Sequence, residues 1–363
     1  MRRTLRLLAA LHLFHRCCDS FVLPSSSSST SCICSSPSRG VQSRSNNHAT
    51  TAAAEIDTET ISVALPSNWR DSSDDNWSIQ AADILTRHGV VALTSSSSNN
   101  NSNSKYEGLI SSQIIEKANK SASSRLQDMQ ARISNRGVDP NGIEDGPFRY
   151  AEIICRDEGG LRYDVPLPWL GGGDIGDDNT TSNQVGSGRI GAPLSSMESE
   201  GVKGLHEAMD EIVPHVLEAL WSNDQDNIID DITNFNDRSS YVAASGYLIN
   251  KPGSKSQNWH KDGPDAGFID CFVPLIDLNE EFGPTAFLLG DKEDNELVPM
   301  LNKGNILLFD YRTIHRGQGN TSEDTTRTLA YAVYRRRERD GDGTKKESGD
   351  VHNFPAALTL EYD

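Results

Sequence analysis

The last third of the chain is dense in short apolar runs, which glycine, proline and asparagine residues separate. Each run has the length of a β-strand, and no second long helical pattern follows residue 241. Many short strands joined by such turns are typical of a β-sandwich or jelly roll. The runs are Gly246–Asn250, Cys271–Asn279, Gly283–Gly290, Gly304–Tyr311 and Thr328–Tyr334. We therefore predict a mainly β fold with its core at about residues 241–337.

Helical patterns precede this region and would flank its strands. The clearest covers residues 201–222, where apolar residues recur three and four positions apart and form one stripe. Pro214 lies inside this stripe and predicts a kink. Residues 77–89 and 106–133 also predict helices, and the first of these leads into a predicted strand at 90–93.

Two low-complexity segments have the composition of surface loops. Residues 95–104 are rich in Ser and Asn, and residues 171–196 are rich in Gly, Asp, Asn and Ser. Gly171–Gly176 formally matches GxGxxG, but no helical pattern follows it, so we interpret the match as chance. We predict that residues 56–363 form a single domain that contains these loops.

Three potential metal ligands lie within the strand-rich region. His260 and Asp262 are two residues apart, so their side chains point the same way on an extended strand. The apolar run that ends near Tyr311 then delivers His315 from a separate strand. Two imidazoles and one carboxylate can bind Fe(II) on one face and leave other coordination positions open. The spacing therefore predicts a metal site made of His260, Asp262 and His315.

Arg327 opens the apolar run that follows His315. Its fork-shaped guanidinium could hold the distal carboxylate of a dicarboxylic cosubstrate. If Arg327 points into the barrel, strand alternation places Leu329, Tyr331 and Val333 on the same face. These residues would then line a cosubstrate pocket beneath the metal.

The order of these motifs resembles the phytanoyl-CoA dioxygenase family. After the HxD motif come PLxDLNxxxGPTxFLxG, from Pro274, and GNxxxFDxRxxHRGxxNxS, from Gly304. The resemblance is close over residues 241–337. It implies a double-stranded β-helix (a jelly-roll, cupin-like core), iron ligands at His260, Asp262 and His315, and a 2-oxoglutarate-binding arginine at Arg327. Arg327 stands one residue later than the family spacing.

The resemblance also implies an activity. Members of the family use Fe(II), 2-oxoglutarate and O2, with ascorbate as an accessory reductant in some cases, and they release succinate and CO2. Related iron halogenases carry a small residue in place of the carboxylate ligand, so Asp262 favours hydroxylation or desaturation over halogenation. The expected substrate is a small molecule, whose identity would be set by variable loops.

Two other functions fit the same residues. The first is a jelly roll that binds a ligand without catalysis. The second is a cupin-type metalloenzyme that does not use 2-oxoglutarate, although such an enzyme has no need for a distal-carboxylate clamp at Arg327. Succinate formation that depends on both iron and 2-oxoglutarate would separate these alternatives from an oxygenase.

The N-terminus has the composition of a targeting sequence. Residues 1–20 combine a basic end with a short apolar segment, which predicts a signal peptide. Residues 21–55 are rich in Ser, contain scattered Arg and are poor in acids, as transit peptides are. This bipartite leader predicts plastid import, with the secretory pathway as the alternative. No segment of the mature chain has the pattern of a transmembrane span.

Charge and cysteine content limit the partners and the redox chemistry. The chain has 52 acidic and 34 basic residues and a net charge of −18, so its surface should repel nucleic acid phosphates and anionic lipid. Four of the six cysteines lie in the leader, and Cys155 and Cys271 are expected to be buried free thiols. His206 and His215 are expected on the solvated polar face of the helix at 201–222. Nothing in the sequence specifies an oligomeric state.

Overall fold

We describe the protein from a computed structural model. The residues described are 57–67, 69–70, 76–96, 108–141, 147–150, 152–157, 159–171, 194–222, 240–289 and 295–336. The predicted leader lies outside these residues, as do most of the two low-complexity loops. The part of the chain after residue 53 forms one compact unit.

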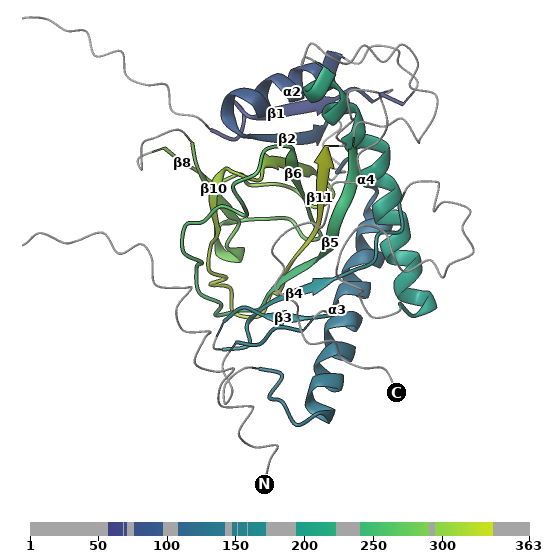
Figure 1. The fold of residues 1–363 in the computed structure, drawn as a ribbon, viewed down its shortest axis with the longest axis vertical. Helices are drawn as coiled ribbons and strands as arrows, with labels where there is room; N and C mark the ends of the chain where they lie inside the picture. The colour runs from purple at the N-terminus through teal and green to yellow at the C-terminus, as the bar shows by residue number, and fades with distance from the viewer. Residues whose placement is uncertain are drawn as a thin grey trace, which may run out of the picture. The chain divides into compact units, whose positions relative to one another are not determined.

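A large mixed sheet carries most of the described strands. Its eight strands lie in the order β1-β2-β9-β6-β11-β5-β4-β3 (Figure 1). All neighbouring strands are antiparallel except β1 and β2 at one edge. In chain order the strands are β1 (Ser62–Leu65), β2 (Val90–Ser95), β3 (Ile154–Cys155), β4 (Arg162–Pro166), β5 (Ser240–Asn250), β6 (Phe268–Pro274), β9 (Ile306–Asp310) and β11 (Arg327–Arg336).

A second sheet is built from segments that alternate along the chain with the strands of the large sheet. It contains β10 (Ile314–Gly317), β7 (Thr285–Leu288) and β8 (Glu296–Leu297), in that order. His260 extends this sheet by pairing with His315 across an isolated bridge. From residue 240 the chain therefore alternates between the two sheets, which is the winding of a double-stranded β-helix. The predicted mainly β fold with a jelly-roll core is confirmed.

An aromatic layer joins the two sheets near the site described below. Phe309 of β9 contacts Phe272 of β6 and Phe287 of β7, with ring centroids 4.9 and 5.2 Å apart. Both contacts are edge-on, as aromatic rings prefer. Phe287 and Phe309 are fully buried. Large buried aromatic side chains thus hold the two facing sheets together.

Three helices flank the large sheet, as predicted. They are α2 (Asn76–His88), α3 (Ser112–Asn135) and α4 (Ser196–Ser222). Helix α3 packs along α4, and α4 in turn contacts β5 and α2 (Figure 1). At Gly201 the two long helices come so close that an added Cβ would lie 2.7 Å from the carbonyl oxygen of Lys117. The apolar stripe predicted for residues 201–222 is buried in these contacts.

Two helix boundaries differ from the prediction. Helix α3 begins at Ser112 rather than at residue 106, and α4 begins at Ser196, inside the segment 171–196 that we predicted to be a loop. The earlier start of α4 results from a capping box. The Ser195 hydroxyl accepts from the N–H of Glu198 at 3.3 Å, and the Glu198 carboxylate accepts from the N–H of Ser195 at 2.8 Å. The S-x-x-E pattern was present in the sequence, but the serine-rich composition around it suggested a loop.

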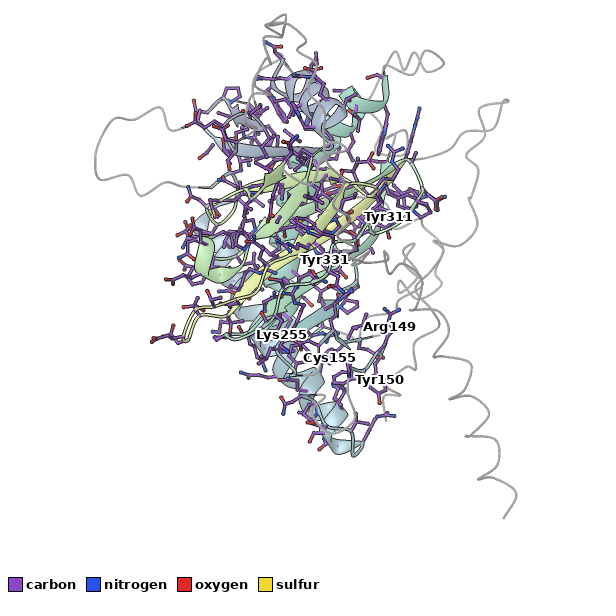
Figure 2. All side chains as sticks on the ribbon, turned by 90° about the vertical axis from the view of Figure 1, so that its left-hand side faces the viewer. Arg149, Tyr150, Cys155, Lys255, Tyr311 and Tyr331 are labelled. Carbon is purple, nitrogen blue, oxygen red and sulfur yellow. The ribbon has the colours of Figure 1, made fainter. Side chains whose placement is uncertain are left out.

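Both cysteines beyond the leader are buried free thiols, as predicted. Burial raises the pKa of Cys155 and of Cys271, so neither is an activated thiolate. Figure 2 places Cys155 near Arg149 and Tyr150, at the β3 end of the sheet. No helix in the described ranges is long and apolar enough to cross a membrane.

Candidate metal and cosubstrate site

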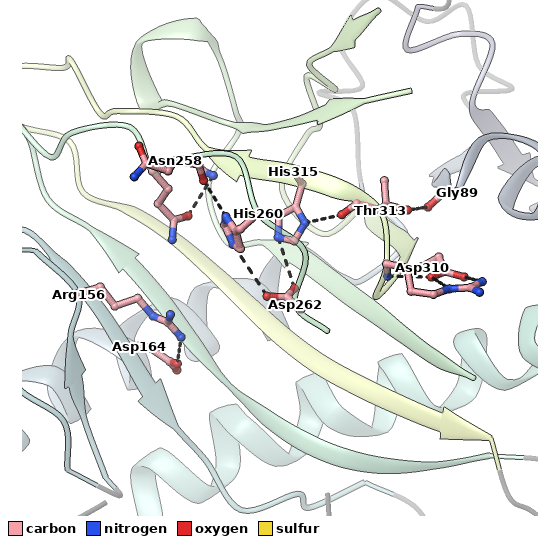
Figure 3. Close-up of polar contacts among 12 residues, drawn as sticks. Gly89, Arg156, Asp164, Asn258, His260, Asp262, Asp310, Thr313 and His315 are labelled. Atoms are coloured by element: carbon pink, nitrogen blue, oxygen red, sulfur yellow. Dashed lines mark hydrogen bonds and ion pairs between the residues drawn. The ribbon is translucent and has the colours of Figure 1, made fainter. Parts of the chain in front are cut away.

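The structure brings His260, Asp262 and His315 together at one end of the barrel (Figure 3). Nε2 of His315 lies 3.4 Å from one carboxylate oxygen of Asp262, and Nε2 of His260 lies 3.9 Å from the other. One ligand atom from each residue falls within 4.8 Å of the other two. Among the described residues this is the single group of three such side chains that could hold a metal ion.

Both imidazoles are oriented with Nε2 toward this centre. Nδ1 of His260 lies 2.8 Å from the carbonyl oxygen of Asn258, and Nδ1 of His315 lies 3.0 Å from that of Thr313. A carbonyl oxygen can only accept, so Nδ1 carries the proton and donates it in both rings. The Nε2 lone pairs are therefore free to bind a metal, and the backbone fixes both the tautomer and the ring plane.

The backbone sets the spacing of the three ligands. His260 and His315 face each other as a hydrogen-bonded antiparallel pair, with N···O distances of 3.0 and 2.9 Å. The N–H of Asp262 then donates to the carbonyl oxygen of Tyr311 at 3.2 Å. Next along the chain, Gly263 passes so close to the Tyr311 ring that an added Cβ would lie 2.4 Å from it. A side chain at residue 263 would displace either the ring or the segment that carries Asp262.

The three ligands differ in exposure, which leaves the centre open on one side. The side chain of His315 is 5% exposed, whereas those of His260 and Asp262 are 35% and 32% exposed. The ring of Phe309 packs 4.9 Å from the His315 ring on the buried side. Burial lowers the pKa of His315, while the charge of Asp262 opposes this effect. A small molecule could thus approach the centre from the side of His260 and Asp262.

The donor set fits a divalent transition metal. Two neutral imidazole nitrogens and one carboxylate oxygen suit Fe(II) and leave coordination positions open. His260, Asp262 and His315 are the residues that would hold the ion.

Arg327 is buried at the start of β11, with 2% of its surface exposed. One guanidinium nitrogen donates to the carbonyl oxygen of Gly283. Burial and the charge of nearby Arg162 lower the pKa of Arg327 to about 9, so it remains charged at neutral pH. Leu329, Tyr331 and Val333, which alternation places on the same face, are also buried.

Sequence reasoning missed a second arginine beside Arg327. Arg162 and Arg327 each lie directly opposite Asn250, on the two strands that flank β5. With the Asn250 amide oxygen turned toward them, Nη2 of each arginine donates to it at 2.9 Å. Burial lowers the pKa of Arg162 to about 10. Arg162 and Asn250 lie in ordinary strand sequence, and no motif could have identified them.

A third arginine, Arg156, lies within electrostatic reach of Asp262. The buried carboxylate of Asp164 pairs with Nη2 of Arg156 at 2.7 Å (Figure 3). It also accepts a hydrogen bond from the Tyr331 hydroxyl at 2.9 Å. Tyr331 reaches across β5 because Gly246 lies beneath it, where an added Cβ would approach the ring to 2.7 Å. Although burial works against it, the charges of Asp164 and Asp262 raise the pKa of Arg156.

A buried carboxyl group also lies beside Asp262. Asp270 of β6 is 3% exposed, and one of its oxygens has no hydrogen-bond partner. Burial raises the pKa of Asp270 well above its usual value, and the charge of Asp262 adds to this effect. A protonated Asp270 could donate to the Asp262 carboxylate and hold it in place.

His206 corrects one prediction. It is 2% exposed rather than solvated, and its ring stacks on Trp169 with centroids 4.1 Å apart. Nδ1 of His206 accepts a hydrogen bond from the N–H of Leu170 at 3.0 Å, so the ring is part of the core. His215 is exposed on the same helix, as predicted. The helical pattern predicted a solvated His206, but residues 169–171 cover that side of α4.

The burial of His206 predicts a loss of stability in acid. Burial lowers the pKa of His206 to about 3, so below its ordinary value near 6.5 the unfolded chain binds a proton that the folded chain does not. The free energy of unfolding should therefore fall by up to about 1.4 kcal/mol per pH unit below pH 6.5. Urea unfolding at pH 7 and pH 5 should show a shallower pH dependence for His206→Asn than for the wild type. Exposed His215→Asn serves as the control, and parallel slopes for His206→Asn and the wild type would contradict the prediction.

Over part of its length the chain is similar to a named dioxygenase. It is 30% identical over 116 residues to "Dioxygenase hkm4" of Aspergillus hancockii, a match that covers 26% of this chain and 38% of that protein. The chain thus matches less than half the length of this relative. No protein-family model matches the chain.

Solved structures similar to the protein include the following two. AviO1 from Streptomyces viridochromogenes Tue57 aligns with a TM-score of 0.41 and 14% identity, over 75% of this chain and 98% of that one. The non-heme alpha ketoglutarate dependent carbocyclase SnoK from nogalamycin biosynthesis aligns with a TM-score of 0.41 and 13% identity, over 74% and 93%. The winding of the two sheets, described above, defines the fold independently of these alignments.

Proposed function

We propose that the protein is an Fe(II)- and 2-oxoglutarate-dependent dioxygenase that hydroxylates or desaturates a small molecule. The observation that carries this proposal is the convergence of His260 Nε2, His315 Nε2 and the Asp262 carboxylate in a barrel that also buries a charged Arg327. The partial match to a named dioxygenase supports it. We also propose, from the motif order, that the chain belongs to the phytanoyl-CoA dioxygenase family.

Each site residue has a distinct role in this chemistry. His260, Asp262 and His315 would hold the metal ion and would leave part of its coordination shell open. When bound, the metal and cosubstrate supply an oxidant for a C–H bond and release succinate and CO2. Arg327 orients the cosubstrate through its distal carboxylate. The buried rings of Phe287 and Phe309 exclude water behind His315.

An anaerobic titration followed by exposure to oxygen tests this function. The full-length protein should bind Fe(II), and adding 2-oxoglutarate should produce the visible charge-transfer band of a chelated 2-oxo acid. Admission of oxygen should then yield succinate only when both Fe(II) and 2-oxoglutarate are present. Metal binding without 2-oxoglutarate binding would instead favour a cupin-type enzyme, and binding of neither would favour a jelly roll without catalysis.

The cellular location is a separate proposal. The bipartite leader of residues 1–55 supports plastid import, and a reporter fused to this segment would test it in an alga with complex plastids. Accumulation of the reporter in the secretory pathway would support the alternative.

A further inference from the structure

The inference concerns three side chains that lie in one row across the large sheet. Arg162 on β4 and Arg327 on β11 both pair with Asn250 on the intervening strand β5. Residues directly opposite one another share a face of the sheet. The row therefore places two guanidinium groups on either side of one amide, although 165 residues separate the arginines in the chain.

The two guanidiniums converge on a single point. Nη2 of each donates to the Asn250 amide oxygen at 2.9 Å. At Gly317, the position of an added Cβ would lie 2.5 Å from Nη1 of Arg162, 3.5 Å from Nη2 of Arg327 and 2.8 Å from Oε1 of Gln257. A side chain at residue 317 would therefore collide with Arg162 and Gln257, so glycine leaves room for these polar groups beside β10.

Within the described residues, no carboxylate forms an ion pair with either arginine of this row. Arg162 and Arg327 are 5% and 2% exposed, and neither forms a salt bridge with a carboxylate among the described residues. Arg162 donates to the carbonyl oxygens of Lys255 and Gln318 at 2.7 and 3.1 Å, and Nε of Arg327 has no partner. Asp157 raises the pKa of Arg162 from a distance, but its Oδ1 is occupied by the N–H groups of Leu161 and Arg162. Two buried like charges with only neutral partners are suited to an anion.

The pair also lies at a suitable distance from the metal centre. His315 and Gly317 are two residues apart on β10, so their side-chain positions share a face and their Cα atoms are about 6.6 Å apart. A five-carbon dicarboxylate spans about 5 Å between its end carbons, given C–C bonds near 1.5 Å. A dicarboxylate of this length held beside His315 is thus long enough to approach Gly317, which lies next to the two arginines.

We propose that Arg162 is a second cosubstrate-binding arginine, which grips the distal carboxylate of 2-oxoglutarate together with Arg327. Paired guanidiniums select dicarboxylic 2-oxo acids over monocarboxylic ones, because each adds a charge-assisted hydrogen bond to the same carboxylate. This inference rests on the proposed function and adds to it a residue from β4, a strand outside the metal-binding motifs.

The experiment compares two cosubstrates that differ only in the distal carboxylate. Full-length protein loaded anaerobically with Fe(II) is titrated with 2-oxoglutarate and with 2-oxopentanoate, and the charge-transfer band reports binding without turnover. In Arg162→Met the affinity for 2-oxoglutarate should fall by about 10- to 100-fold, while the affinity for 2-oxopentanoate stays within about 2-fold of wild type. Arg162→Lys keeps the charge without the fork and should fall in between.

The controls separate this role from a structural one. Arg87→Met removes an exposed arginine on α2 and should change neither affinity. Since Arg162 also bonds the backbone near Lys255 and Gln318, a structural role would weaken both cosubstrates equally, and that result would overturn the inference. Unchanged 2-oxoglutarate affinity would overturn it as well. If Arg162→Met does not fold, the relative affinity of Arg162→Lys for 2-oxoglutarate and 2-oxopentanoate tests the inference instead.

The outcome also distinguishes this inference from the proposed function. If the wild-type protein binds Fe(II) but no 2-oxoglutarate, both fail together. If the wild type and Arg87→Met bind 2-oxoglutarate normally and Arg162→Met does too, the inference alone fails.

Discussion

Asp262→Ala is expected to abolish succinate formation from 2-oxoglutarate. The carboxylate of Asp262 lies between the two imidazoles, 3.4 Å from His315 Nε2 and 3.9 Å from His260 Nε2, and it is the single anionic ligand of the site. Alanine removes both the ligand atom and the charge that offsets the metal. Even residues that only orient ligands cost about 10- to 100-fold when replaced, so loss of a ligand should cost more than about 100-fold. Fe(II)-dependent succinate release by the purified variant measures this effect.

A nearby carboxylate provides the matched control. Asp265 is exposed three residues further along the same segment, and Asp265→Ala should retain activity close to that of the wild type. Both variants should melt near the wild-type temperature without metal, since Asp262 is one third exposed. Wild-type turnover by Asp262→Ala would rule out the metal site as assigned.

Arg327→Met is expected to raise the KM for 2-oxoglutarate by about 30-fold or more. Removing one partner of a buried, hydrogen-bonded charge pair costs about 2–5 kcal/mol, and 2 kcal/mol corresponds to about 30-fold in affinity. Arg327 is fully enclosed, so water cannot replace the lost guanidinium. Steady-state succinate formation at varied 2-oxoglutarate concentration gives the KM, and Fe(II) affinity measured in parallel should be unchanged.

Arg335→Met on the same strand is the appropriate control. Arg335 stacks over the ring of Phe268 at 5.0 Å, at the opposite end of β11 from Arg327. This variant should keep the wild-type KM. A normal 2-oxoglutarate KM in Arg327→Met would remove the reason to prefer 2-oxoglutarate chemistry over a cupin-type reaction that needs no distal-carboxylate clamp.

Local patterns predicted the secondary structure better than they predicted boundaries or burial. Short apolar runs separated by turn residues after residue 241 were sufficient for the jelly roll, because its central strands are buried along most of their length. The start of α4 was missed, since composition was weighed above the Ser195–Glu198 capping box. His206 was misplaced because helical periodicity identifies a polar face but does not show which distant segment covers it.

The turn before β11 and the pairing of β11 with β5 fix the position of Arg327. The buried amide of Asn320 binds the carbonyl oxygens of Asn250 and Thr325, at 3.0 and 2.7 Å, and so fixes the turn before β11. From that turn the strand begins at Arg327, directly opposite Asn250. The register of the strand pair, rather than the number of residues after His315, determines where the guanidinium lies.

The sequence by itself determined the fold class and four candidate residues: His260, Asp262, His315 and Arg327. It could do so because these residues lie in or beside strands that the local sequence pattern identifies. Only the tertiary structure decided that the three ligands meet, that both imidazoles present Nε2, and that Arg162 lies beside Arg327. Those features depend on which strands pair and in what register, and pairing between distant segments leaves no local mark in the chain.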